Sequence, residues 1–337
     1  MSIGKVNPEP MNLETSGHGA SKPQRILVIG ANGQIGSELV SALAAQHGAA
    51  NVIAADIGNE NVYHAARYTR LDVLDQIALR QIVAHERITH IYQLAAMLSA
   101  SGEQAPLKAW TLNMEGLLNV LEVARQRGQI GQPLRIFWPS SIAVFGPSSP
   151  PVATPQSTVM DPGTMYGISK LAGERLCDYY FNKYGVDVRS IRYPGIISYK
   201  APPGGGTTDY AIAIFHAALR GERYSCFLTP DTTLPMIYML DAIRATIALM
   251  DAPGAEITIR TAYNIAGLSF SPAQLAQAIR AVLPDFTIEY KPDNRQAIAA
   301  TWPQSLDDSR ARADWGWQAQ VDIEALVADM LAHVKPA

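Results

Sequence analysis

The chain has 337 residues, enough for one large α/β domain or two smaller ones. Hydrophobic residues make up 48% of it, so it can form a substantial core. The formal net charge of −3 gives no reason to expect nucleic acid or an anionic membrane surface as a partner. No run of about 18 apolar residues is present, so the sequence predicts no transmembrane helix. The two cysteines, Cys177 and Cys226, make no disulfide framework and fit a reducing compartment, so we expect a cytoplasmic protein.

The first segment, residues 1–23, is polar and shows no apolar periodicity. It lacks the hydrophobic stretch of a secretory signal and the arginines of a mitochondrial presequence. We therefore expect a flexible arm or an expression remnant.

A glycine-rich turn opens the remainder of the chain. An apolar strand predicted at 25–29 leads into Gly30, Gly33 and Gly36 and then into a helical pattern. Glycines at this spacing allow a tight turn and a close approach of backbone amides to a pyrophosphate at a helix N-terminus. A second strand predicted at 51–55 is followed by Asp56, at the distance of about 20 residues expected for a carboxylate that holds the adenosine ribose. Because an acid there repels a 2′-phosphate, the pattern favours NAD over NADP. The alternative to a dinucleotide-binding site is a purely structural turn followed by a surface aspartate.

Alternating strands and helices follow, and they predict an α/β fold with a doubly wound, parallel Rossmann-type sheet. The further strands are predicted at 67–70, 88–93, 134–139 and 187–192. A smaller C-terminal α+β lobe is predicted from helical patterns near 209–220, 240–250, 271–282 and 321–334. We thus expect residues 24–195 to form the cofactor-binding domain with the catalytic residues, and residues 196–337 to form mainly a substrate-binding lobe.

Tyr166 and Lys170 are the strongest catalytic candidates. They are four residues apart, so on a helix they share one face. A phenol has a pKa of about 10, and a neighbouring ammonium favours its ionised form and lowers that pKa. Ser141 lies upstream and can hold a substrate oxygen, while strand alternation sends the competing hydroxyl of Ser140 to the opposite face. Together the three side chains suit proton transfer to or from an alcohol; a chance helix pair is the alternative.

The glycine turn, the Tyr-x-x-x-Lys motif and the serine 25 residues before the tyrosine together resemble the extended branch of the short-chain dehydrogenase/reductase superfamily. Within it, the second half of the chain resembles the short-chain type of NAD-dependent L-threonine 3-dehydrogenases. That likeness rests on residues 192–197, 203–211, 234–239, 263–267, 295–303 and 307–317, and the whole resemblance covers roughly residues 24 to 334. It implies oxidation of L-threonine at C3 to 2-amino-3-oxobutyrate, with hydride transfer to NAD and Tyr166 as the base.

The same resemblance implies a cofactor site. The residues expected to contact NAD are Gly30, Asn32, Gly33, Gln34, Ile35, Gly36, Asp56, Asp72, Leu94, Ala95, Ala96, Asn113, Tyr166, Lys170, Tyr193, Pro194 and Ile196. Two of them have open alternatives. Asp72 suits a helix N-cap as well as an adenine contact. Asn113 suits either a buried polar support or a surface amide.

The substrate is expected to meet Ser141, Tyr166, Ser99, Thr207, Thr208 and Trp302. Thr207 and Thr208 follow three glycines and are candidates for the carboxylate and amine of the substrate. Thr208 also suits the N-cap of the next helix, and Ser99 suits a cap in a mobile loop. Trp302 suits a pocket wall or a packed core position.

Neither the histidines nor the cysteines show metal-ligand spacing, so we expect no metal. Two rival functions stay open. A nucleotide-sugar epimerase or dehydratase would need a pocket rich in Arg and Lys, whereas residues 203–210 contain neither. A non-catalytic NAD-binding sensor would be expected to lack the tyrosine or the lysine. We also expect a homodimer formed through the long helices of the Rossmann domain.

Overall fold

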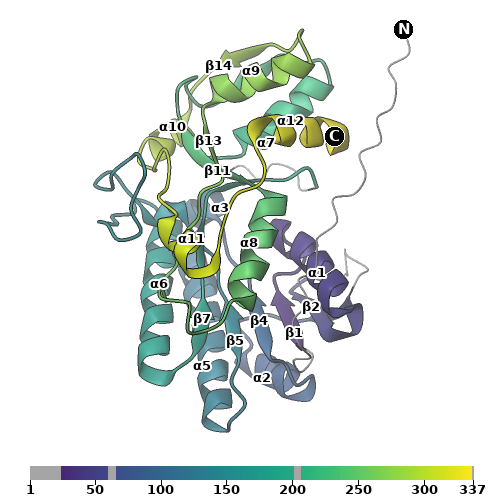
Figure 1. Ribbon diagram of the computed structural model, residues 1–337, viewed down its shortest axis with the longest axis vertical. Helices are drawn as coiled ribbons and strands as arrows, with labels where there is room; N and C mark the ends of the chain where they lie inside the picture. Colours follow the sequence, from purple (N-terminus) through teal and green to yellow (C-terminus); the bar gives the residue numbers. More distant parts are fainter. Residues whose placement is uncertain (1–23, 60–65, 201–205, 336–337) are drawn as a thin grey trace.

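The computed structural model of the protein describes residues 24–59, 66–200 and 206–335. The expected arm at residues 1–23 and the run 201–205 lie outside these residues. A six-stranded parallel sheet forms the centre, in the order β3-β2-β1-β4-β5-β7 (Figure 1). Its strands are β1 (Ile26–Ile29), β2 (Val52–Asp56), β3 (Arg67–Arg70), β4 (His90–Gln93), β5 (Arg135–Phe137) and β7 (Asp187–Arg189). The prediction of a doubly wound parallel sheet is confirmed, with the strand order reversing between β1 and β4.

Successive residues of β1 belong to two different cores. Ile26 and Val28 join the face covered by α1 (Gln34–His47) and α8 (Met239–Asp251). Leu27 and Ile29 join the face covered by α2, α5 and α6. These helices span Gln76–His85, Gly116–Gln129 and Met165–Tyr184. Because side chains alternate along a strand, a strand covered on both faces has an uninterrupted apolar sequence.

The C-terminal lobe has a core of its own, formed by α7 (Tyr210–Leu219), α9 (Pro272–Val282) and α12 (Ile323–His333). It lies above the sheet in Figure 1. Two small sheets belong to this part, β13-β11-β9 and β10-β14. Their strands are β9 (Gly195–Ile197), β10 (Tyr224–Cys226), β11 (Leu234–Tyr238), β13 (Leu268–Phe270) and β14 (Ile288–Tyr290). The expected smaller α+β lobe is therefore present.

The packing nevertheless crosses residue 195, where we expected the domains to divide. Helix α8 and helix α11 (Ser309–Trp315), with Trp317 behind it, lie in the core on the α1 face of the central sheet. Two short helices, α10 (Asn294–Ala299) and α11, were not among the predicted elements. The chain thus returns to the first domain after it has entered the lobe.

The predicted strand at 187–192 is split into β7 and β8 (Ile191–Tyr193). The predicted strand at 134–139 is shortened to β5, and a second short strand that was not predicted, β6 (Ser140–Ser141), follows it. Pro139 lies between β5 and β6, where it cannot donate a ladder hydrogen bond. A separate parallel sheet, β12-β8-β6, forms from β6 and β8 with β12 (Tyr263–Asn264). Its register pairs Ser141 with Tyr193.

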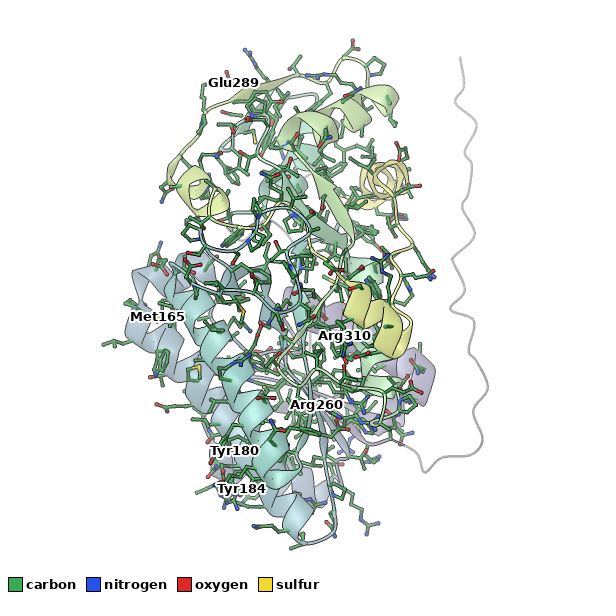
Figure 2. All side chains as sticks on the ribbon, turned by 60° about the vertical axis from the view of Figure 1, so that its left-hand side comes forward. Met165, Tyr180, Tyr184, Arg260, Glu289 and Arg310 are labelled. Carbon is green, nitrogen blue, oxygen red and sulfur yellow. The ribbon has the colours of Figure 1, made fainter. Side chains whose placement is uncertain are left out.

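The remaining helical segments lie between β4 and α5 and after β6. They are α3 (Ser99–Gln104), α4 (Pro106–Trp110), a π-helical turn at Thr111–Glu115 and a 3-10 turn at Ile142–Val144; another 3-10 turn, Ala49–Asn51, precedes β2. Helix α6 runs down the side of the sheet, with Met165 at its end nearer the lobe and Tyr184 at the far end (Figure 2). Among the described helices, none is long and apolar enough to cross a membrane.

Candidate active site

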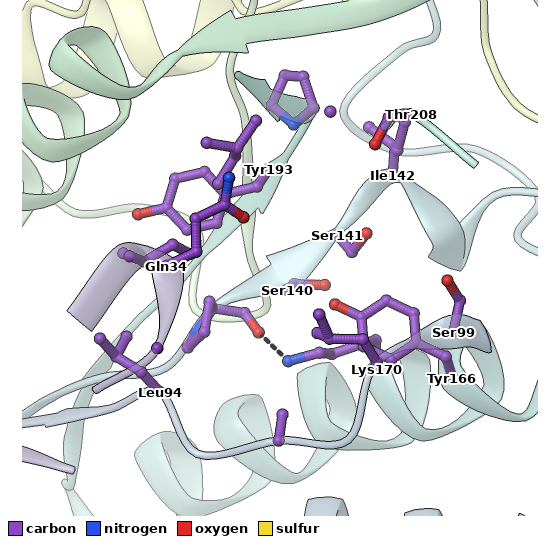
Figure 3. Close-up of a pocket in the computed structure, with 18 of the residues that line it drawn as sticks. Gln34, Leu94, Ser99, Ser140, Ser141, Ile142, Tyr166, Lys170, Tyr193 and Thr208 are labelled. Carbon is purple, nitrogen blue, oxygen red and sulfur yellow. Dashed lines mark hydrogen bonds between the residues drawn. The ribbon is translucent and has the colours of Figure 1, made fainter. Parts of the chain in front are cut away.

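A pocket opens at the carboxyl ends of the central strands, beneath the C-terminal lobe (Figure 3). On one side it is lined by the glycine turn and the first residues of α1, and on the other by residues 139–142 and helix α6. The segments after β4 and β8 and residues 207–209 complete the wall. Ligands in doubly wound sheets bind at this edge. The predicted residues that line it are Gly30, Gly33, Gln34, Ile35, Gly36, Leu94, Ala96, Ser99, Ser141, Tyr166, Lys170, Tyr193, Pro194, Ile196, Thr207, Thr208 and Trp302.

The glycine turn fits a pyrophosphate. Gly30 has a φ of +82°, and a Cβ there would lie 2.6 Å from the backbone nitrogen of Ala95. A Cβ on Gly36 would overlap the carbonyl oxygen of Gly30. The N-cap of α1 is Gly33, so no side chain caps this helix, and its first turn contains no acidic residue. The free N–H groups and the positive end of the helix dipole thus face the pocket, which suits an anion.

Asp56 ends β2 and is held by backbone donors. Its Oδ2 accepts a hydrogen bond from the backbone nitrogen of Asn32 at 2.9 Å, and its Oδ1 accepts one from Ile57 at 2.8 Å. The carboxylate is therefore tied to the glycine turn in a fixed orientation. Neither Asp56 nor Asn32 lines the pocket itself, and the same is true of Ala95, which packs beneath Gly30.

Asp72 is not the N-cap of α2, so that interpretation is wrong. Its Oδ1 accepts from the backbone nitrogen of Leu74 at 2.9 Å, which closes a turn before the helix. The cap is Asp75, whose side chain accepts from Ala78 at 2.9 Å. Both aspartates have the same local propensity, and the turn geometry decides between them. Asp72 does not line the pocket either.

Asn113 is a buried polar support, which excludes the surface-amide alternative. It is 4% exposed, and its Oδ1 accepts from the backbone nitrogen of Met97 at 2.8 Å. Its Nδ2 donates to the carbonyl of Met97 at 3.1 Å and to Oγ of Ser169 at 3.1 Å. Asn113 therefore fastens the segment after β4 to helix α6 from behind the pocket.

Ser141, Tyr166 and Lys170 come together as the sequence predicts (Figure 3). Helix α6 begins just before the tyrosine because Thr164 caps it, accepting from Gly167 at 3.1 Å. Tyr166 shares a side-chain hydrogen bond with Ser141. The ammonium of Lys170 lies 5.5 Å from the centre of the Tyr166 ring and is 2.6 Å from the carbonyl oxygen of Pro139, to which it donates.

Burial controls the ionisation of this cluster. It raises the pKa of Tyr166 to about 12, and the hydrogen bond with Ser141 only partly opposes this shift. Burial also lowers the pKa of Lys170 to about 7, against the attraction of Cys177 and Glu174. The net shift of the Tyr166 pKa is therefore upward, because burial outweighs the lowering effects around the phenol. The ammonium is itself destabilised by burial and is directed at a backbone carbonyl.

The two neighbouring serines point in different directions, as strand alternation predicts. Oγ of Ser140 is buried and donates to Oε1 of Glu174 at 2.6 Å. Oγ of Ser141 accepts from the backbone nitrogen of Ala143 at 3.2 Å and is the hydroxyl beside Tyr166. Only Ser141 is thus free to meet a substrate oxygen.

The substrate candidates also line the pocket, but two capping interpretations are wrong. Helix α7 begins at Tyr210 with Asp209 at its cap position, so Thr208 is not the cap. Helix α3 begins at Ser99 itself, with Leu98 at the cap position. The hydroxyls of Thr208 and Ser99 therefore do not cap these helices. Trp302 is half-buried: it forms part of the wall and also packs against the core around Leu306.

Six lining residues were missed; five are next to a predicted one in the chain, and the sixth, Pro139, is two residues from Ser141. They are Leu98, Pro139, Ser140, Ile142, Gly195 and Asp209. Proximity to a candidate in the chain was the signal that could have found them. Asp209 carries an acid to the same wall, where its Oδ2 accepts from the backbone nitrogen of Gly206 at 2.8 Å.

Residues 26–266 match the NAD dependent epimerase/dehydratase family. The chain belongs to this family. A bovine (Bos taurus) relative, the mitochondrial L-threonine 3-dehydrogenase, is 44% identical over 327 residues, which are 96% of this chain and 86% of the relative. The GalE-like L-threonine dehydrogenase of Cupriavidus necator, in its holo form, is 58% identical with a TM-score of 0.90, covering 92% of this chain and 100% of that one. The L-threonine dehydrogenase of Phytophthora infestans is 47% identical with a TM-score of 0.88, covering 92% and 98%.

These likenesses extend along nearly the whole chain, so the resemblance to the extended short-chain dehydrogenases is confirmed. The protein is an NAD-dependent oxidoreductase, and its cofactor is NAD. A UDP-glucose 4-epimerase of Thermotoga maritima has a TM-score of 0.79 at 22% identity, which shows a shared fold alone.

Proposed function

We propose that the protein oxidises the secondary alcohol at C3 of L-threonine to a ketone, giving 2-amino-3-oxobutyrate. One observation carries this proposal. Ser141, Tyr166 and Lys170 meet at one end of a pocket whose other end is an uncapped helix N-terminus behind a glycine turn. The two relatives whose sequences align with nearly the whole chain at 44% and 58% identity are L-threonine dehydrogenases.

Each polar group at the reacting end has one role. NAD supplies the hydride acceptor and, in its oxidised form, a positively charged ring. Tyr166, as phenolate, removes the proton of the C3 hydroxyl, while Ser141 donates to or accepts from the same oxygen and fixes its position. Lys170, whenever it carries its proton, favours the ionised form of the phenol 5.5 Å away. Ser141 favours that form too, because its hydrogen bond lowers the pKa of Tyr166.

The rest of the pocket suits a small zwitterion. Among the described residues that line it, Lys170 is the one cationic side chain, whereas a nucleotide sugar would need cations for its diphosphate. Ser99, Thr207 and Thr208 offer neutral hydroxyls for the carboxylate and the amine, with Trp302 as a wall. In this proposal residues 24–195 bind NAD and residues 196–337 bind mainly the substrate, although α8 and α11 support the first part.

The test is the appearance of NADH absorbance when the purified protein is given NAD and L-threonine. Activity is expected with threonine and not with UDP- or GDP-sugars. Turnover of a nucleotide sugar in preference to threonine would assign the epimerase or dehydratase alternative. No NADH from any member of a panel of β-hydroxy amino acids would favour a non-catalytic NAD-binding sensor.

We further propose that the protein is a cytoplasmic homodimer formed through α5 and α6. Helix α6 exposes Ile168, Tyr179 and Tyr184, each more than two-fifths exposed, so it offers apolar side chains to a partner subunit. Both cysteines are free and buried, as suits a reducing compartment. Light scattering on the purified protein should give twice the chain mass. A related threonine dehydrogenase from a metagenome is described as monomeric, and a monomer mass here would contradict the proposal.

A further inference from the structure

Three consecutive residues, Pro139–Ser141, contact three successive turns of α6. Tyr166, Lys170 and Glu174 are spaced by four residues and so lie along one face of the helix. Ser141 meets Tyr166, and the carbonyl of Pro139 accepts from Lys170 at 2.6 Å. Between these two residues, Ser140 donates to Glu174 at 2.6 Å. Two of the three contacts involve the reacting groups Tyr166 and Lys170, whereas the contact of Ser140 with Glu174 involves neither.

The third contact is the most firmly anchored of the three. Glu174 is 0% exposed and Arg192 is 1% exposed, and two hydrogen bonds of 2.8 Å join the carboxylate to the guanidinium. Arg192 also donates to the carbonyl of Gln156 at 2.9 Å and to Oδ1 of Asn264 at 3.0 Å. It lies on β8 directly opposite Ser140 on β6. The carboxylate is thus fixed from a second strand before it binds the serine.

A buried ion pair is weak evidence for stability, because desolvation of the two charges offsets their attraction. Its geometric effect is clearer. Strand β6 has only two residues, so its own ladder contributes little to its position. The hydrogen bond from Ser140 to Glu174 therefore sets where this short strand lies against α6.

We propose that Glu174 is a positioning residue, whose carboxylate, clamped by Arg192, holds Ser140 and so fixes the Ser141 hydroxyl against the Tyr166 phenol. This role presupposes the alcohol oxidation proposed above. Glu174 touches neither substrate nor cofactor in it; it acts through Ser140 and the backbone that Ser140 shares with Ser141. Proton transfer depends on that distance, and a misplacement of about 1 Å can cost as much as 10²-fold in rate.

The sharpest test is Ser140→Ala, which removes this contact and leaves the pair of Glu174 and Arg192 intact. We expect kcat for threonine to fall by about threefold to thirtyfold, with the Kd for NAD unchanged. Tyr180→Phe is the matched control. It removes another 2.6 Å hydrogen bond of α6, from Tyr180 to Glu122 on α5, and should leave kcat unchanged.

The pH profile separates positioning from a general loss of stability. The hydrogen bond with Ser141 lowers the pKa of Tyr166, so a loosened Ser141 raises that pKa. The acid limb of kcat/KM should then move to higher pH in Ser140→Ala and stay in place in Tyr180→Phe. The other charged groups around the tyrosine are Lys170 on its own helix, Glu103 on α3, which accepts from the backbone of Met165, and Asp209 at the pocket wall. Neither substitution alters them.

Glu174→Gln extends the test, because the amide keeps the length of the side chain and removes the charge that holds Arg192. A larger fall in kcat than in Ser140→Ala is expected if this variant folds, and Ser140→Ala decides the matter alone if it does not. An active parent whose Ser140→Ala variant matches Tyr180→Phe in kcat and pH profile would overturn the positioning role. A parent that does not oxidise threonine would instead overturn the proposed function.

Discussion

At the glycine turn the groups that face the pocket are backbone amides, whereas at the opposite end they are the side chains of Ser141, Tyr166 and Lys170. The first end is shaped by missing atoms: a Cβ on Gly30 or Gly36 would collide with backbone. The second is shaped by burial, which raises the pKa of Tyr166 and lowers that of Lys170, so that both side chains favour their neutral forms. The shape of the backbone therefore determines binding at the glycine turn, whereas the protonation states of the side chains determine reactivity at the opposite end.

This difference determines what a substitution should do at each end. Removing the hydroxyl oxygen of Tyr166 or Ser141 should change turnover and spare cofactor binding. Adding an atom to the backbone end should disturb folding and cofactor binding together.

Tyr166→Phe should give the largest effect at the reacting end. The ring still fills its place while the ionisable oxygen is lost, so kcat should fall on the order of 10³-fold and NAD affinity should change less than about twofold. Steady-state kinetics and a fluorescence titration with NAD measure the two quantities. Near-normal turnover would remove the tyrosine from the mechanism and return Ser141 or a water to consideration.

Gly36→Ala should be the most damaging change at the backbone end. The new Cβ would overlap the carbonyl oxygen of Gly30 and lie 2.8 Å from Cα of Ala31, so the turn must shift. We expect the free energy of unfolding to fall by about 3 kcal/mol, with weaker NAD binding. Gly128→Ala on α5 is the control, since its Cβ would meet nothing within 4 Å. Equal denaturation midpoints for the two variants would contradict the steric account.

Ser141→Ala should reduce turnover without abolishing it, because orientation is only part of the barrier. A fall in kcat of about 10- to 100-fold is expected. The hydrogen bond from Ser141 lowers the pKa of Tyr166, so its loss raises that pKa and the acid limb of kcat/KM should move to higher pH. A pH series on parent and variant measures this. A limb that moves to lower pH would show that Ser141 does not stabilise the phenolate.

Asp56→Ala should weaken NAD binding and change the choice between NAD and NADP. Loss of the carboxylate removes both a ribose partner and the repulsion of a 2′-phosphate, so the preference for NAD over NADP should narrow by about tenfold. Asp72→Ala is a useful comparison, since it lowers NAD affinity only if Asp72 contacts the adenine. A parent protein that prefers NADP would sink the assignment of Asp56.

Chelation should have no effect. Among the residues that the structure describes, no group of three or more His, Cys, Asp or Glu could hold a metal ion. Activity should therefore survive prolonged dialysis against EDTA. If chelation abolished turnover and zinc restored it, the site where the substrate reacts would contain a metal ion.

The sequence predicted what depends on local period and spacing. The run Ile26–Ile29, the three glycines and Asp56 identify a strand, a turn and the end of the next strand, because each signal lies within a few residues. Tyr166 and Lys170 share a face for the same reason, since four residues make about one helical turn. Local propensity was weaker where several residues compete for one role, and Asp75 and Asp209 took the cap positions expected of Asp72 and Thr208.

By itself, then, the sequence determined the sheet, the glycine turn and the facing pair on α6, because hydrophobic period and glycine stereochemistry are local properties. Only the tertiary structure decided the ionisation of Tyr166, because desolvation depends on everything that packs around a group. It also decided that Asn113 supports the pocket from behind and that α8 returns to the first domain. Glu174, Arg192 and Ser140 meet in the same way, from three separate elements whose contact no local pattern encodes.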